Sequence, residues 1–208
     1  RSGRFFSGAD TLTRVSDPLT TGCGAFDAVL GGGIERGVVT QLYGPPASGK
    51  TNVALTVAAE AAAAGERVLY VDTEDLSLTR FRDIAAARAD ETAVPELTER
   101  LIVSEAADFD EQSEAVRDTE EFAERVGLIV LDSATGFYRL ERTAEDNEGE
   151  TLRAVARQIT HLLALAKRHD LAVVVTNQVF TDPDADRTRP LGGNTLEHWT
   201  GVVVGLER

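Results

Sequence analysis

Short apolar runs alternate along this chain with longer segments in which apolar residues recur every three or four positions. The short runs have the composition and length of buried strands, and they lie at 38–43, 67–72, 101–104, 128–132, 171–176 and 201–206. The longer segments predict helices at about 51–64, 109–125 and 148–169. Strands and helices that alternate in this way predict an α/β fold, with a mainly parallel sheet flanked by helices.

The predicted helix at 148–169 has the clearest apolar face, made of Leu152, Val155, Ile159, Leu162, Leu163 and Ala166. Residues 1–19 are polar and are expected to form a flexible N-terminal segment, while 20–208 has the length of one domain. Because the chain ends inside an apolar run at 202–206, a domain truncated at its C-terminus is one interpretation.

One segment has the spacing of a phosphate-binding P-loop. It follows the strand predicted at 38–43 and consists of Gly44, Pro45, Pro46, Ala47, Ser48, Gly49, Lys50 and Thr51. Glycine lets the backbone curl so that its N–H groups point at phosphate oxygens, and the next helix presents its positive end to the same anion. Lys50 is expected to reach the β- and γ-phosphates, and the Thr51 hydroxyl to bind Mg²⁺. The segment therefore predicts binding of ATP or GTP.

Three more polar segments follow predicted strands, at 72–74 (DTE), 132–133 (DS) and 176–178 (TNQ). In an open parallel sheet the carboxyl ends of the strands form the ligand-binding edge, so these segments should lie near the P-loop. Asp132 ends an apolar strand and is expected to hold Mg²⁺, through a water molecule. The alternative is that Asp132 caps a helix or a turn.

Two side chains of these segments are candidates for catalysis together with Lys50. Glu74 is predicted to position and deprotonate the water that attacks the γ-phosphate, and the alternative is a solvated loop acid. Gln178 is predicted to sense the γ-phosphate through a hydrogen bond, and the alternative is that it satisfies loop backbone groups.

The chain is strongly acidic, with 21 basic and 35 acidic residues and a net charge of −14. Its basic residues are arginines apart from Lys50 and Lys167. Dense surface carboxylates keep a protein soluble when concentrated salt screens charge over short distances, so the composition suggests a salt-adapted protein. The alternative is an ordinary acidic protein that repels nucleic acid.

Cysteine, histidine and hydropathy add few constraints. The single cysteine, Cys23, excludes an internal disulfide and is predicted to be a small buried thiol. The three histidines lack metal-ligand spacing. Because the sequence shows no signal peptide and no membrane-spanning apolar run, a cytoplasmic protein is expected.

Several segments together resemble the RecA/RadA recombinase superfamily. Residues 20–27 (TTGCGAFD) and 30–37 (LGGGIERG) look like its lead-in to the P-loop, and 71–74 (VDTE) looks like its catalytic-glutamate strand. Residues 131–135 (LDSAT) are similar to its Walker B segment. The flanks of its second DNA-binding loop are similar to 175–179 (VTNQV) and 190–194 (PLGGN).

This resemblance covers residues 18–208 and implies a RecA-like P-loop NTPase core at 20–208. Within the superfamily, the P-loop and residues 195–199 (TLEHW) look like a short archaeal paralogue of RadA that lacks an N-terminal helix-hairpin-helix domain. The resemblance implies an accessory protein of DNA repair and homologous recombination, of the mediator type, that depends on ATP and Mg²⁺. Such a protein binds single-stranded or branched DNA, hydrolyses ATP weakly, promotes no strand exchange alone, regulates the processing of branched DNA and has RadA or another repair protein as partner.

By the same resemblance, DNA-binding loops should lie near residues 137–149 and at 181–189. Their candidate phosphate contacts are Arg139, Arg142, Arg187 and Arg189. Both loops also carry acidic residues, so the alternative is that these arginines form ion pairs and touch no DNA.

Two other functions remain as alternatives. One is a filament-forming strand-exchange recombinase, which would be an oligomer, and residues 6–9 (FSGA) formally fit the Phe-x-x-Ala polymerisation motif of recombinases. The other is a KaiC-like signalling ATPase, whose P-loop lead-in is similar.

Overall fold

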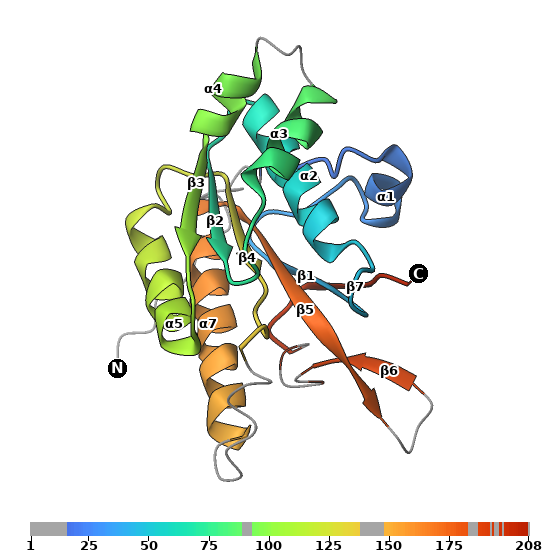
Figure 1. Ribbon diagram of the computed structural model, residues 1–208, viewed down its shortest axis with the longest axis vertical. Helices are drawn as coiled ribbons and strands as arrows, with labels where there is room; N and C mark the ends of the chain where they lie inside the picture. The colour runs from blue at the N-terminus through green and yellow to red at the C-terminus, as the bar shows by residue number, and fades with distance from the viewer. Residues whose placement is uncertain are drawn as a thin grey trace, which may run out of the picture.

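The computed structural model describes residues 16–88, 93–137, 148–182, 187–191, 193, 196 and 198–207. A seven-stranded sheet forms its centre, with six parallel strands in the order β3-β2-β4-β5-β1-β7 and with β6 antiparallel to β5 (Figure 1). The strands are β1 Val39–Gly44, β2 Val68–Asp72, β3 Leu101–Glu105, β4 Leu128–Asp132, β5 Ala172–Asp182, β6 Arg187–Pro190 and β7 Val202–Gly205. The predicted α/β fold with a mainly parallel sheet is confirmed.

Helices cover both faces of this sheet (Figure 1). They are α1 Gly24–Val29, α2 Lys50–Ala63, α3 Leu78–Ala86, α4 Val94–Glu99, α5 Phe109–Asp118 and α7 Glu148–His169, and α5 leads into a 3₁₀ turn, η2 Thr119–Glu121. The longest helix, α7, lies beside α5 on one face, while α2 and α3 lie on the other (Figure 1).

Side chains alternate along the strands and thereby fill two separate cores. On one face, Val68 and Tyr70 of β2 pack with Leu55 of α2 and Phe81 of α3. On the other face, the neighbouring residue Val71 of β2 belongs to a cluster with α5 and α7. Burial on both faces explains why these strands are continuous apolar runs in the sequence.

The structure agrees with the predicted elements in most places and differs in three, and one predicted burial is also wrong. Strand β5 continues to Asp182 and pairs with β6, whereas 181–189 was expected to be a loop. The helix predicted at 109–125 ends at Asp118 and is followed by the 3₁₀ turn. The helices α1, α3 and α4 were not predicted, because each is short. The expectation that Cys23 is buried is wrong: its thiol is exposed, just before α1.

Within the described residues, none of the helices combines the length and the hydrophobicity that crossing a membrane requires. The expected flexible segment at 1–19 falls largely outside the described residues, of which the first is Ser16.

Candidate nucleotide site at the edge of the sheet

The P-loop connects β1 to α2 with a backbone that requires glycine at two positions. Gly49 precedes the helix with φ of 95°, a left-handed conformation that L-residues with side chains rarely adopt. A Cβ atom on Gly44 would lie 2.5 Å from both the Leu206 carbonyl oxygen and the Ser48 Oγ atom. The Ser48 Oγ atom is buried and has no hydrogen-bond partner among the described residues. The loop thus wraps tightly around the start of α2 and leaves a polar atom unsatisfied.

Lys50, the first residue of α2, lies at the base of this loop. Its side chain is 8% exposed, and its Nζ atom donates to the carbonyl oxygens of Gly44 at 3.0 Å and Pro45 at 3.1 Å. Burial lowers the pKa of the Lys50 ammonium, whereas the charges of Glu74 and Asp132 oppose that shift. Two carboxylates are therefore close enough to influence this ammonium group.

Asp132 ends β4 in the middle of the sheet and is 2% exposed. It accepts hydrogen bonds from the hydroxyls of Tyr70, at 2.7 Å, and Thr176. Burial raises the pKa of the Asp132 carboxyl above its usual 3.8, and hydrogen bonds from Thr176, Tyr70 and Thr51 oppose this shift. A capping carboxylate accepts from backbone N–H groups, whereas these donors are side-chain hydroxyls of the neighbouring strands and α2. The arrangement does not favour the cap alternative.

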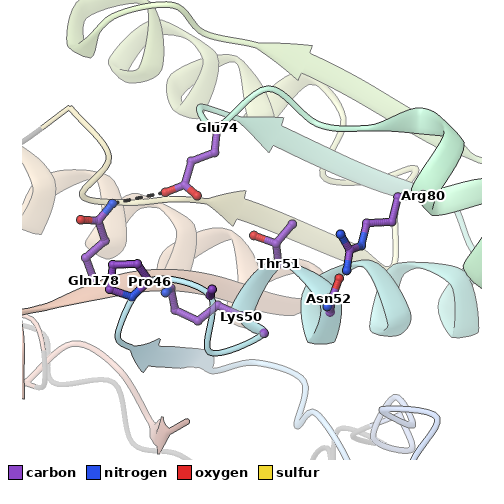
Figure 2. Close-up of a pocket in the computed structure, with 9 residues that line it drawn as sticks. Pro46, Lys50, Thr51, Asn52, Glu74, Arg80 and Gln178 are labelled. Carbon is purple, nitrogen blue, oxygen red and sulfur yellow. Dashed lines mark hydrogen bonds between the residues drawn. The ribbon is translucent and has the colours of Figure 1, made fainter. Parts of the chain in front are cut away.

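Glu74 lies in a short loop after β2 that the Asp72 side chain holds. Asp72 accepts hydrogen bonds from the backbone N–H groups of Glu74 and Leu76. The Glu74 Oε1 atom accepts from the Ser133 hydroxyl at 2.8 Å and, at the long limit of 3.5 Å, from the Gln178 amide (Figure 2). Glu74 is exposed, yet its carboxylate has partners just after β4 and on β5.

Further hydrogen bonds join the ends of β4 and β5. The Thr135 hydroxyl donates to Asn177 Oδ1 at 2.7 Å and accepts from the Gln178 backbone N–H at 3.2 Å. The Asn177 amide in turn donates to the Leu191 carbonyl at 2.8 Å, just after β6. These bonds tie the β5–β6 hairpin to the same edge of the sheet.

One cavity of about 410 Å³ gathers most of these groups. Figure 2 shows Lys50 and Thr51 at the start of α2, with the Gln178 amide pointing toward the Glu74 carboxylate on the far side of the cavity. Among the predicted site residues, Pro46, Ala47, Gly49, Lys50, Thr51, Glu74 and Gln178 line the cavity. Gly44, Pro45 and Ser48 are the other residues of the loop and do not line the cavity, and neither does Asp132, whose carboxylate interacts with the Thr51 hydroxyl.

Sequence reasoning missed two lining residues, Asn52 and Arg80. Asn52 follows the P-loop motif on α2, and Arg80 comes from α3. A signal for α3 exists in the sequence, because Ser77 is an N-cap whose hydroxyl accepts from the Arg80 backbone N–H at 3.3 Å.

The four arginines expected to contact DNA are placed only in part. Arg139 and Arg142 fall outside the described residues. Arg187 and Arg189 belong to β6, where their backbones pair with Asp182 and Phe180 of β5. The contact of these four arginines with DNA therefore stays a hypothesis. The alternative, in which they form ion pairs with acidic residues of the same loops, also stays a hypothesis.

The described part of the chain contains no cluster of three or more Asp, Glu, His or Cys side chains that could hold a metal ion. The Mg²⁺ expected here needs fewer protein ligands, because it usually keeps several waters and binds one or two carboxylates together with substrate phosphates. The Thr51 hydroxyl beside the buried Asp132 carboxylate is a donor set of that kind. The residues therefore fit the ion.

The comparisons with known proteins agree with this fold and site. The Rad51 family model matches residues 15–208. The DNA repair and recombination protein RadB of Halobacterium salinarum is 65% identical over 192 residues, which cover 91% of this chain and 80% of that protein. RadB of Methanococcoides burtonii is 41% identical over 198 residues, which cover 95% and 86%.

A solved structure, the crystal structure of the RadB recombinase, aligns with a TM-score of 0.73 at 34% identity and covers 90% of this chain and 82% of that one. The chain therefore belongs to the Rad51 family, and within it to the RadB proteins of DNA repair and recombination. The expected RecA-like core is confirmed, and the salt-adapted composition expected from the sequence is in keeping with the relative from Halobacterium.

Proposed function

We propose that this chain is an ATP-binding accessory protein of recombinational DNA repair, with weak ATP turnover. The observation that carries the proposal is the cavity that brings Lys50 and Thr51 together with Glu74 and Gln178, above the buried Asp132. Four strands, β1, β2, β4 and β5, carry these groups or lead into the segments that do, so their convergence is a property of the whole sheet rather than of one motif.

ATP is the proposed substrate, held by the P-loop. The backbone N–H groups at the start of α2 are available to phosphate oxygens. Lys50 would exchange its two carbonyl partners for the β- and γ-phosphates. Thr51 and Asp132 would hold Mg²⁺, which supplies positive charge to the phosphate oxygens. Arg80, across the cavity from Glu74 (Figure 2), is placed to contact the base or the sugar.

Hydrolysis needs a water whose oxygen attacks the γ-phosphorus while the bond to the β–γ bridging oxygen breaks and ADP leaves. Glu74 would take the proton of that water, and the Ser133 hydroxyl would fix the orientation of the carboxylate. Turnover would be slow, because Glu74 is exposed and active sites gain rate when closure excludes water.

DNA is the proposed partner of the β5–β6 hairpin, which carries Arg187 and Arg189. Two arginines release few counterions, so binding should be modest, independent of sequence and weak in high salt. An accessory role beside RadA or another repair protein suits such weak binding better than strand exchange by this chain alone. The name of the RadB relatives, DNA repair and recombination protein, supports the same setting.

The test measures ATP affinity, and single-stranded DNA affinity with and without a non-hydrolysable ATP analogue, in high KCl. Lys50→Ala should weaken ATP binding at least about tenfold, which is about 1.4 kcal/mol, because the charge facing the phosphates is lost. Lys167→Ala, at the other lysine, is the matched control in the last turn of α7 and should behave like the wild type. Equal ATP affinity in Lys50→Ala and the wild type would contradict the nucleotide assignment.

A further inference from the structure

A second cavity, of about 330 Å³, lies between α5 and α7 on the sheet face opposite to α2. Its lining includes Ser113, Val116, Arg117, Arg157, Gln158 and His161, and we call it the α5/α7 pocket. None of the residues assigned to ATP or to DNA lines it. Its chemistry therefore requires a separate explanation.

Two arginines of this pocket lack acidic partners. Arg117 projects from α5 and Arg157 from α7, both exposed, and neither forms an ion pair or a side-chain hydrogen bond with any residue that the structure describes. Arg168, also on α7, does pair with Glu120 at 3.0 Å. In a chain with 35 acidic and 21 basic residues, two adjacent unpaired guanidinium groups form a local site for an anion.

Buried polar atoms extend this site inward. The Nε2 atom of His161 is buried and has no hydrogen-bond partner within the described residues. Leaving such an atom unsatisfied is unfavourable, and an oxygen atom of a ligand would relieve that cost. Ala154 of α7, which also lines the pocket and is half-buried, adds an apolar contact beside the charged groups. A ligand that matches the pocket therefore carries negative charge together with aliphatic surface.

A chain of hydrogen bonds connects the pocket to the nucleotide edge. Gln158, which lines the pocket, donates to the Ser113 hydroxyl at 2.8 Å and accepts from the Gln112 amide at 2.7 Å. The same Gln112 amide donates to the Ala134 carbonyl at 3.2 Å. Ala134 follows Ser133, whose hydroxyl donates to Glu74. Gln112 is fully buried, so this connection passes through the interior.

We propose that the α5/α7 pocket binds the carboxylates of an acidic segment of a partner protein, and that the Gln158–Gln112 chain links its occupancy to Ser133 and Glu74. A polypeptide fits better than a nucleic acid, because it can place an aliphatic side chain against Ala154 next to the carboxylates that the two arginines bind, whereas a sugar–phosphate backbone carries no aliphatic side chain. The link to Glu74, unlike the binding, rests on the proposed ATP site.

The binding is tested without nucleotide, by fluorescence anisotropy of a short labelled oligoglutamate. The double variant Arg117→Gln, Arg157→Gln should bind it at least about tenfold more weakly than the wild type, because both charge-assisted contacts are lost. The matched control is Arg153→Gln, Arg82→Gln, which makes the same charge change at exposed arginines outside the pocket. Equal weakening in both doubles, or none in the pocket variant, would overturn the proposal. The proposal would also be overturned if single-stranded DNA displaced the oligoglutamate probe and if that displacement required Arg117 and Arg157.

The link is tested by repeating the titration with a non-hydrolysable ATP analogue. The analogue should change oligoglutamate affinity in the wild type, and oligoglutamate should change analogue affinity by the same factor. Gln112→Met, with a thermal melt to confirm folding, should bind both ligands and lose this mutual effect; Gln158→Met is the second variant if the first does not fold. A mutual effect that persists in the variant, or that is absent from the wild type while both ligands bind, overturns the link. If the analogue binds neither protein, the ATP site is refuted and the result on the pocket stands.

Discussion

The sharpest single test of the proposed mechanism is Glu74→Gln. The change keeps the size of the side chain, and the Oε1 atom of glutamine can still accept the 2.8 Å hydrogen bond from Ser133. What is lost is a negative charge and a group able to take a proton. A positioned base contributes about 10²–10⁴ to a rate. Because Glu74 is exposed, bulk water can partly replace it, so we expect the lower end of this range.

The expected loss is therefore about a hundredfold in the rate of hydrolysis, or about 2.7 kcal/mol of transition-state stabilisation. Binding of ATP should be unchanged or slightly tighter, because a carboxylate that faces the same cavity as the phosphates has been neutralised. Single-turnover phosphate release measures the first quantity, and equilibrium titration with a fluorescent ATP analogue measures the second.

The matched control is Glu105→Gln. This acid is also exposed and lies at the same edge of the sheet, as the last residue of β3, but it lines a different cavity. It should leave both the rate and the affinity at wild-type values. If Glu74→Gln hydrolyses ATP as fast as the wild type, or if Glu105→Gln is slowed equally, Glu74 is not the base.

Two further predictions concern the metal ligand and the hairpin. Asp132→Asn should abolish hydrolysis yet increase the free energy of unfolding at neutral pH. The pKa of the Asp132 carboxyl is raised in the folded state, so its charge destabilises the wild-type fold at pH values above that folded pKa. Below the unfolded value of 3.8 the carboxyl is neutral in both states. The variant's higher stability in urea melts, relative to the wild type, should therefore disappear there. The double variant Arg187→Ala, Arg189→Ala should weaken single-stranded DNA binding uniformly across sequences and reduce its salt dependence. Equal affinity and equal salt slope in variant and wild type would remove the hairpin from the DNA site.

Local patterns were sufficient to predict most of the fold. The P-loop and the strand ending in Asp132 are continuous segments, so the residue types within each segment are enough to predict its local structure. These local patterns do not predict which strands are neighbours in the sheet. Tyr70 and Thr176 reach Asp132 because β2 and β5 flank β4, with Asp72 level with Asp132 and Val175 level with Leu131.

Short elements and long-range side-chain contacts could not be predicted from the sequence either, because they depend on residues that are far apart along the chain. The helix α3 spans 9 residues and buries Phe81 and Ala85, too brief an apolar pattern to separate from a loop without its cap. The β6 strand contains arginines and a proline, and it is a strand because β5 extends far enough to pair with it. The Gln112–Gln158 bond joins residues 46 positions apart, which no periodicity encodes.

The length of β5 bears on how ATP and DNA would influence each other. It has 11 residues, whereas β4 has 5, and it carries Thr176 against Asp132, Gln178 against Glu74 and then one arm of the hairpin. The other arm returns at Leu191, whose N–H donates to the Gln178 carbonyl at 2.9 Å. Under the proposed function, a γ-phosphate that draws the Gln178 amide away from Glu74 acts on a residue bonded to both arms. The hairpin would therefore shift as a unit, and DNA held by it would act on Gln178 with the same coupling free energy in the reverse direction.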